Sequence, residues 1–302
     1  MEGLVICSTG RWCDVYRNGK MYKCSLKGNL RLKGMKTTNP VAVGDRVLFE
    51  ADEQNSSGRV YEILERKNVL IRRATNLSRQ THILAANVDL AVLIATPILP
   101  RTSTGFIDRF LITAEAYNIP ALIVFNKLDL FKEEMSVVEY YNEIYHGAGY
   151  STMMVSSTEG TNTEEFRKAI AGKTILLAGH SGVGKSTLIK ALAPDVKIKI
   201  GNISAAHLKG THTTTFARMY MLPGDTLVID TPGIKEFGVV DFEPWELGHW
   251  FREFKEYIPG CRYANCTHQH EPGCAVREAA EAGKIHEERY SNYLGILNNI
   301  SA

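Results

Sequence analysis

The sequence predicts a multidomain α/β protein with a small N-terminal β-barrel, a doubly wound α/β domain and a helical C-terminal domain. Its 302 residues are more than one compact core usually holds. Apolar and polar residues alternate in the first quarter of the chain, strands alternate with helices in the middle, and a cysteine cluster interrupts the helical last part. We therefore expect three domains, at residues 1–75, 76–240 and 241–302.

Short alternating runs between Gly, Asn and Ser residues predict the strands of the N-terminal part. These runs are residues 4–7, 13–17, 20–25, 46–50 and 59–64. So many short strands in a small domain favour a closed barrel, of which the oligonucleotide-binding (OB) barrel is the commonest form. Three cysteines lie in these strands, and we expect buried thiols at Cys7, Cys13 and Cys24.

Basic residues gather in the same part, because no acidic residue lies between Asp14 and Asp45. A stretch of one sign suits a polyanion, since each neutralised phosphate releases counterions. The candidate RNA contacts in this stretch are Lys23, Lys27, Arg31, Lys33 and Lys36. A solvated basic surface is the alternative interpretation.

The middle of the chain alternates solid apolar runs with helical patterns, as in a parallel sheet covered by helices on both faces. The predicted strands are residues 90–95, 121–125, 152–155 and 174–178. The predicted helices are residues 106–117, 137–145, 163–170 and 186–192. A β-hairpin of residues 215–222 and 226–229, turned by Pro223, Gly224 and Asp225, follows them.

A phosphate-binding loop lies between a predicted strand and a predicted helix, where residues 179–186 fit G-x-x-x-x-G-K-[ST]. The N–H groups of such a loop face nucleotide phosphates at the helix N-terminus. We expect Lys185 to reach the β and γ oxygens and Ser186 to ligate Mg²⁺. The residues assigned to the phosphates are Gly179, His180, Ser181, Gly182, Val183, Gly184, Lys185, Ser186 and Thr187.

Two later segments complete the predicted catalytic site. Asp230 follows an apolar strand, where a nucleoside triphosphatase holds its Mg²⁺, and the N–H of Gly233 meets the γ-phosphate. In the polar segment 210–215, Thr214 is the favoured hydroxyl ligand, with Thr213 the next choice. The Mg²⁺ ligands are thus Ser186, Thr214 and Asp230, and the catalytic residues are Lys185, Thr214 and Gly233.

Hydrolysis by this site alone should be slow. Many GTPases place a water-orienting glutamine directly after the glycine of D-x-x-G, whereas this chain has Ile234 there. The water-positioning group is therefore unidentified, and it comes from elsewhere in the chain or from a partner.

A second motif selects the base. In Asn126-Lys127-Leu128-Asp129, the carboxylate of Asp129 can accept from the N1–H and amine of guanine, Asn126 braces the loop, and the stem of Lys127 covers the ring. Backbone contacts from Ser156 and Ser157 to O6 would complete a GTP site. These segments precede the phosphate loop, the reverse of the usual GTPase order, which indicates a circular permutation.

A metal cluster lies near the C-terminus. Cys261, Cys266, His268 and Cys274 provide three thiolates and an imidazole within fourteen residues, a closed set that suits one structural zinc ion. His270 is an alternative to His268 as the nitrogen ligand.

In this order the motifs resemble the circularly permuted GTPases, specifically the small-ribosomal-subunit-dependent GTPase A family, over nearly the whole chain. The residues that carry the resemblance are 126–129, 179–186, 210–215, 230–233 and 261–274. It implies a factor that acts late in assembly of the bacterial small ribosomal subunit, with hydrolysis stimulated by the subunit and coupled to release. The partners that the resemblance implies are the subunit, its rRNA and GTP or GDP. The resemblance also favours His268 over His270 as the nitrogen ligand of the zinc ion. Some members carry a histidine where this chain has Asp241.

Composition sets the remaining expectations. No apolar run reaches the roughly 18–20 residues of a bilayer helix, and the first residues lack the cationic region of a signal peptide. We expect a cytoplasmic monomer with reduced cysteines and no membrane contact. One alternative function is an RNA-binding zinc protein that uses GTP as a passive sensor. Another is a phosphoryl-transfer kinase, against which Asp129 and the lack of a recognisable acceptor site argue.

Overall fold

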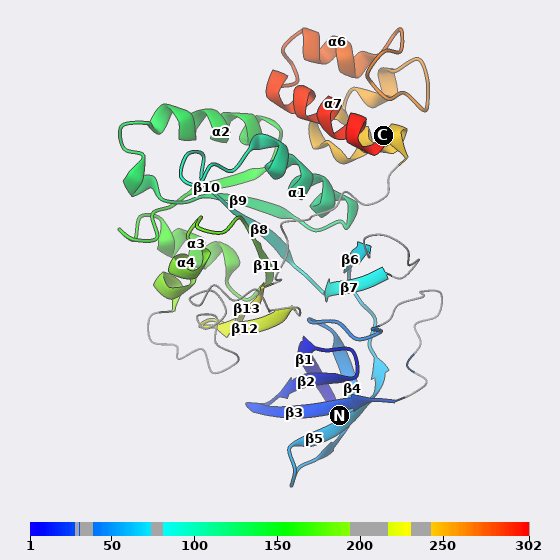
Figure 1. Cartoon of the computed structure of the whole chain (residues 1–302), viewed down its shortest axis with the longest axis vertical. Helices are drawn as coiled ribbons and strands as arrows, with labels where there is room; N and C mark the ends of the chain where they lie inside the picture. The colour runs from blue at the N-terminus through cyan, green and yellow to red at the C-terminus, as the bar shows by residue number, and fades with distance from the viewer. Residues whose placement is uncertain (28–29, 31–38, 74–80, 194–216, 231–242, 302) are drawn as a thin grey trace. The chain divides into compact units, whose positions relative to one another are not determined.

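The computed structural model describes residues 1–27, 30, 39–73, 81–193, 217–230 and 243–301 (Figure 1). The chain forms two compact units that interleave along the sequence. The first contains residues 1–91, 167–178 and 189–236, and the second contains residues 92–166, 179–188 and 237–302. Among the described residues, no helix combines enough length and apolarity to span a bilayer.

The first unit begins with a five-stranded barrel, as the alternating runs predicted. Its strands are β1 (Glu2–Ser8), β2 (Trp12–Arg17), β3 (Lys20–Leu26), β4 (Arg46–Asp52) and β5 (Ser57–Ile63). They pair in the order β1-β2-β3-β5-β4, and β4 pairs back with β1 to close the barrel. The β3–β5 pair is parallel and the others are antiparallel. This confirms the OB-like barrel.

Side-chain alternation fills the barrel interior. Val5, Val15, Tyr22, Phe49 and Val60 are all buried in one cluster, because every second residue of each strand points inward. Cys13 and Cys24 lie in the same cluster, directly opposite each other on β2 and β3. Burial raises the pKa of Cys13 to about 12 and that of Cys24 to about 11. Together with the buried Cys7, they confirm the expectation of buried thiols.

The rest of the first unit contains further strands. β6 (Val69–Arg73) and β7 (Thr81–Ala86) form an antiparallel pair that the sequence patterns did not predict. β11 (Thr174–Ala178) runs parallel to β13 (Thr226–Asp230), which pairs antiparallel with β12 (Arg218–Leu222). These last two strands confirm the predicted hairpin within the described residues. β12 also meets β1, where Cys7 is opposite Arg218.

Parallel strands and helices make up the second unit. β10 (Ser151–Met154) pairs with β9 (Ala121–Phe125), and the other neighbour of β9 is β8 (Leu90–Ala95), which begins at the boundary between the units. All five residues of β9 are buried, as its solid apolar run predicted. The helices are α1 (Thr104–Ala116), α2 (Met135–Gly147), α3 (Thr163–Ile170) and α4 (Lys185–Leu192), of which α3 and α4 cross into the first unit.

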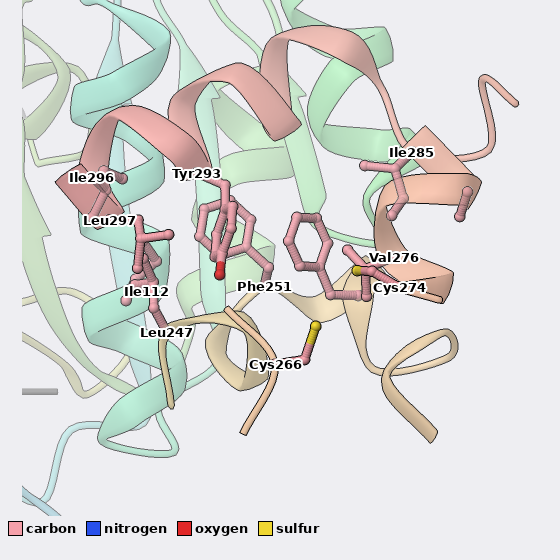
Figure 2. Close-up of a cluster of buried hydrophobic side chains, with 12 residues drawn as sticks. Ile112, Leu247, Phe251, Cys266, Cys274, Val276, Ile285, Tyr293, Ile296 and Leu297 are labelled. Atoms are coloured by element: carbon pink, nitrogen blue, oxygen red, sulfur yellow. The ribbon is translucent and has the colours of Figure 1, made fainter. Parts of the chain in front are cut away.

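The C-terminal part of the second unit is short 3₁₀ turns and two helices rather than regular helix throughout. Its elements are η3 (Pro244–Trp250), η4 (Arg252–Phe254), η5 (Ile258–Gly260), α6 (Ala275–Glu281) and α7 (Glu287–Ser301). Figure 2 shows their hydrophobic cluster, in which Phe251, Tyr293 and Leu297 gather with Ile112 of α1. α1 therefore shares a core with the C-terminal elements.

The barrel offers a sharp stability test at Gly44, which has φ +92° and approaches β7 so closely that a Cβ would lie 2.1 Å from the carbonyl oxygen of Ala86. Gly10 has almost the same φ, +93°, with nothing within 4 Å of such a Cβ. Replacing either glycine by alanine adds a left-handed alanine, but only Gly44→Ala must also displace backbone. We expect Gly44→Ala to lower the free energy of unfolding by about 2 kcal/mol more than Gly10→Ala. Urea denaturation measures both, and equal losses would contradict the close approach.

Candidate nucleotide-binding and metal sites

The predicted phosphate loop connects β11 to α4, which begins at Lys185. The ammonium group of Lys185 donates to the carbonyl oxygens of Gly179 at 2.5 Å and His180 at 2.8 Å. Val183 is buried, whereas Ser181 is exposed. The loop thus curls around its own lysine at the N-terminus of α4, where N–H groups point away from the helix.

The side chain of Asn126 joins this loop to two others. Asn126 follows β9 and is only 1% exposed. Its Nδ2 donates to the carbonyl oxygen of Val183 at 2.9 Å. Its Oδ1 accepts from the hydroxyl of Ser157 at 2.8 Å and from the N–H of Ser157 at 3.2 Å. One buried amide therefore ties the Asn126 loop, the phosphate loop and the loop after β10 together.

Gly184 permits this arrangement. It has φ +96°, and a Cβ there would lie 2.3 Å from Nδ2 of Asn126. Since a side chain would occupy the place of the amide, the second glycine of the G-x-x-x-x-G-K-[ST] motif is required by a contact as well as by its φ.

Asp129 is held by the same group of loops. Its Oδ1 accepts from the hydroxyl of Ser156 at 2.6 Å, and Ser156 is itself buried. Partial burial raises the pKa of Asp129, but hydrogen bonds from Ser156 and Thr158 outweigh it, so the net pKa is below the usual range. The carboxylate is ionised at neutral pH and its loop is fixed.

Lys127, which follows Asn126 in the chain, adopts a left-handed conformation with φ +69°. Its ammonium group donates to the carbonyl oxygen of Leu99 at 3.0 Å. The structure thus brings the predicted base-reading residues, Asn126, Lys127, Asp129, Ser156 and Ser157, into one unit with the phosphate loop. Thr158, a further partner of Asp129, was not singled out from the sequence; its place two residues after Ser156 was the only available signal.

Other predicted residues lie elsewhere. Asp230 ends β13 in the first unit. Thr214, Gly233 and Ile234 fall outside the described residues, so their roles stay predictions.

Of the five candidate RNA contacts, Lys23 and Lys27 are exposed, whereas Arg31, Lys33 and Lys36 lie outside the described residues. The Lys23 ammonium lies 5.8 Å from the centroid of the Trp12 ring, and Trp12 is 48% exposed. Sequence reasoning missed Trp12 as an exposed aromatic beside a lysine. The available signal was the alternation of β2, in which Trp12 lies on the same strand face as the polar Asp14.

The four predicted metal ligands converge in the C-terminal part of the second unit. One ligand atom from each of Cys261, Cys266, His268 and Cys274 lies within 4.8 Å of the others. Nδ1 of His268 is 3.6 Å from Sγ of Cys261 and 3.4 Å from Sγ of Cys274, and those two sulfurs are 4.0 Å apart. Figure 2 shows Cys266 and Cys274 among the residues of the hydrophobic cluster, with Cys274 beside Val276. The four residues could hold a metal ion.

The chemistry of the donors agrees with a cation at this place. Burial lowers the pKa of His268 to about 4, so at pH 7 the imidazole is neutral and has a lone pair to offer. Burial raises the pKa of Cys266 to about 12 and that of Cys274 above its usual value, which disfavours thiolates in the absence of a cation. A bound dication reverses this preference, because it stabilises the thiolates directly.

Hydrogen bonds outside the cluster hold the ligand-bearing loop in place. The carboxylate of Glu271 accepts from the N–H and hydroxyl of Thr267, at 2.7 and 2.6 Å, and from the N–H groups of Gln269 and His270. The hydroxyl of Tyr290 donates to the carbonyl oxygen of His268 at 2.7 Å. The backbone on both sides of His268 is therefore fixed before any metal binds.

A permuted phosphate-loop fold, a predicted base-reading loop braced against the phosphate loop, and an OB-like barrel are together the features of a circularly permuted GTPase. Comparison with known families agrees: residues 63–240 match the RsgA GTPase model and residues 2–59 match the RsgA N-terminal domain. The chain belongs to the RsgA GTPase family and is a GTPase.

Full-length relatives and solved structures are similar to this chain. The "Small ribosomal subunit biogenesis GTPase RsgA 2" of Bacteroides thetaiotaomicron is 50% identical, covering 99% of this chain and 97% of the relative. The RsgA of Christiangramia forsetii is 46% identical, covering 98% and 96%. YjeQ from Thermotoga maritima matches with a TM-score of 0.79 at 34% identity, covering 100% of this chain and 98% of YjeQ. YloQ, described as a circularly permuted GTPase, matches with a TM-score of 0.74 at 29% identity, covering 99% and 94%.

Metal content tests the cluster. We expect Cys266→Ala to lose the bound metal and to lower the Tm of the C-terminal part, because three donors are left and a closed site is opened. Cys24→Ala is the matched control, since Cys24 is also a buried cysteine but lies in the barrel. Elemental analysis of both purified variants measures the metal; equal metal content in the two would contradict the assignment.

Proposed function

We propose that this chain is a GTP hydrolase that binds the small ribosomal subunit and assists its late maturation, with hydrolysis stimulated by the subunit and coupled to release. The hydrogen bonds of Asn126 to Val183 and Ser157 carry the proposal, because they unite base-reading and phosphate-binding loops in one site. The names of the full-length relatives support the ribosomal partner.

The guanine base is read by the carboxylate of Asp129, which Ser156 and Thr158 hold ionised and oriented. Asn126 would support the base loop, the stem of Lys127 would cover the ring, and backbone groups of Ser156 and Ser157 would contact O6. On binding, the ammonium of Lys185 exchanges the carbonyl oxygens of Gly179 and His180 for phosphate oxygens, which are stronger acceptors.

The Mg²⁺ that accompanies GTP would be held by Ser186, Thr214 and Asp230, and it would neutralise charge that develops on the phosphates. Gly233 would donate its N–H to the γ-phosphate. Since Ile234 has no group that aligns water, the small subunit either supplies that group or orders one of this chain's own.

Cys261, Cys266, His268 and Cys274 would hold one structural zinc ion. A tetrahedral ion with Zn–S bonds of about 2.3 Å and Zn–N bonds of about 2.0 Å places its ligand atoms about 3.5–3.8 Å apart. The observed separations of 3.4, 3.6 and 4.0 Å are close to this spacing. Four protein ligands leave no position for a reacting water, so the ion stabilises the fold.

Domains at 1–75, 76–240 and 241–302 would divide this work among RNA binding, GTP hydrolysis and zinc binding. The candidate contacts of the barrel with rRNA are Lys23, Lys27, Arg31, Lys33 and Lys36. The exposed Trp12 ring beside Lys23 supports a nucleic-acid surface, because bases stack on aromatic faces. The protein would act as a cytoplasmic monomer, cycling between GTP and GDP.

Base recognition is tested by Asp129→Asn. Xanthine has a carbonyl where guanine has its amine, so an amide donor at position 129 should shift preference from GTP to xanthosine triphosphate by about a hundredfold or more. Competition binding with the two nucleotides measures the shift. Asp225→Asn, in the turn between β12 and β13, is the control that keeps the preference for GTP. An Asp129→Asn variant that still prefers GTP would refute the assignment of residues 126–129 to the guanine base.

Partner stimulation is tested by phosphate release with purified ribosomal subunits. We expect small subunits to raise the rate of GTP hydrolysis by at least about tenfold, because a partner supplies or orders the water-positioning group. Large subunits should have little effect, and Lys185→Ala should remain inactive with either. Absence of stimulation, together with equal RNA affinity in the GTP and GDP forms, would favour the passive-sensor alternative.

A further inference from the structure

The first turn of α1 packs against the phosphate loop through one ring contact. The Phe106 ring lies with its centroid 4.0 Å from that of the His180 imidazole, and the two planes are inclined by 34°. Phe106 is only 7% exposed. The carbonyl oxygen of His180 is also an acceptor for the ammonium group of Lys185. The ring contact and the lysine hydrogen bond therefore meet at one residue of the loop.

The segment before α1 is stiff and lies against the same loop. The N–H of Thr102 donates to the carbonyl oxygen of Thr96 at 2.8 Å, and the hydroxyl of Thr102 accepts from the N–H of Thr96 at 3.1 Å. Between them, Pro100 lies beside Gly182, so that a Cβ on Gly182 would be 3.5 Å from its ring. The start of α1 is thus placed next to the loop by the backbone as well as by Phe106.

The other face of α1 is anchored in the C-terminal part. Asp108, two residues after Phe106, is fully buried and pairs with Arg289 of α7, which is 1% exposed. The guanidinium of Arg289 also donates to Glu253 at 2.6 and 3.0 Å, and Asn292 donates to Asp108 at 2.7 Å. A buried charge that loses its partner is strongly unfavourable, so α1 cannot shift along α7 without a large penalty.

We propose that Phe106 is a positioning residue for the nucleotide. Its ring holds His180, and with that residue the backbone of the phosphate loop, in the conformation that receives the phosphates. This rests on the proposed assignment of residues 179–186 to the phosphates of GTP. Because α1 is anchored by Asp108, the ring is a fixed support against which the loop is preorganised, and preorganisation lowers the cost of ordering on binding.

The position of the contact determines which kinetic constant depends on it. Phe106 touches a loop that holds phosphates in both the ground state and the transition state, and it lies outside the predicted catalytic set. Loss of the ring therefore removes binding that is uniform along the reaction, which raises KM and leaves kcat unchanged. GDP should lose affinity together with GTP, because the loop holds phosphates that both nucleotides carry.

Phe106→Leu tests the ring while keeping apolar volume. We expect it to raise KM for GTP and Kd for GDP about three- to tenfold, the effect of one lost ring contact, with kcat retained. Phe106→Tyr keeps the ring and should have a KM close to that of the wild-type protein. Phe110→Leu is the matched control: it removes another buried ring from α1, one turn further on, and should lower Tm but leave KM unchanged.

A double-mutant cycle keeps the test decisive if Phe106→Leu folds poorly. His180→Ala removes the other ring from a half-buried loop position and should raise KM to the same degree. The KM of the double variant Phe106→Leu/His180→Ala should be no higher than the higher KM of the two single variants, because each substitution removes the same ring contact. Unchanged KM in both single variants, or additive effects in the double variant, would overturn the inference. Failure of wild-type protein to hydrolyse GTP would instead overturn the proposed function.

Discussion

The arrangement of the candidate nucleotide site depends on one buried amide, because the side chain of Asn126 bonds to both the phosphate loop and the loop after β10. An amide in the interior must keep its partners, since an unpaired donor or acceptor there costs about 1–3 kcal/mol. The loops therefore favour one relative arrangement, and Gly184 is required beside them so that the amide can approach. The loops predicted to bind the base and the phosphates are therefore joined by the same small network of hydrogen bonds.

A second constraint fixes α1, which contacts both the phosphate loop and the C-terminal part. Its Ile112 lies in the hydrophobic cluster of the C-terminal part, and its Asp108 pairs with Arg289. Burial raises the pKa of Asp108, and the adjacent guanidinium opposes that rise, so the pair is stable only while both charges stay together. The C-terminal part, whose own core is the hydrophobic cluster of Figure 2, is thereby attached to the helix that borders the phosphate loop.

Sequence reasoning predicted most of what local patterns encode. Strands such as β9 and β11 were predicted to the residue because solid apolar runs specify them, and the order of the motifs indicated the permuted GTPase fold that the structure has. The β6–β7 pair was missed, since β6 carries adjacent arginines in place of clear alternation. Contacts between residues far apart in the sequence could not be predicted from local patterns. Asp108 and Arg289, for example, are 181 residues apart, and nothing local in either helix identifies its partner. The ring contact of Phe106 with His180 was hidden for the same reason.

The permuted order of the loops has a consequence for synthesis. Asn126 and Val183 are separated by 57 residues, and the base-reading loop is translated first. While the chain grows, that loop is complete before the segment that its amide bonds has been made, so a nascent chain that ends before Val183 lacks this hydrogen bond. The contact that joins these two loops therefore forms only after the segment that follows β11 has left the ribosome.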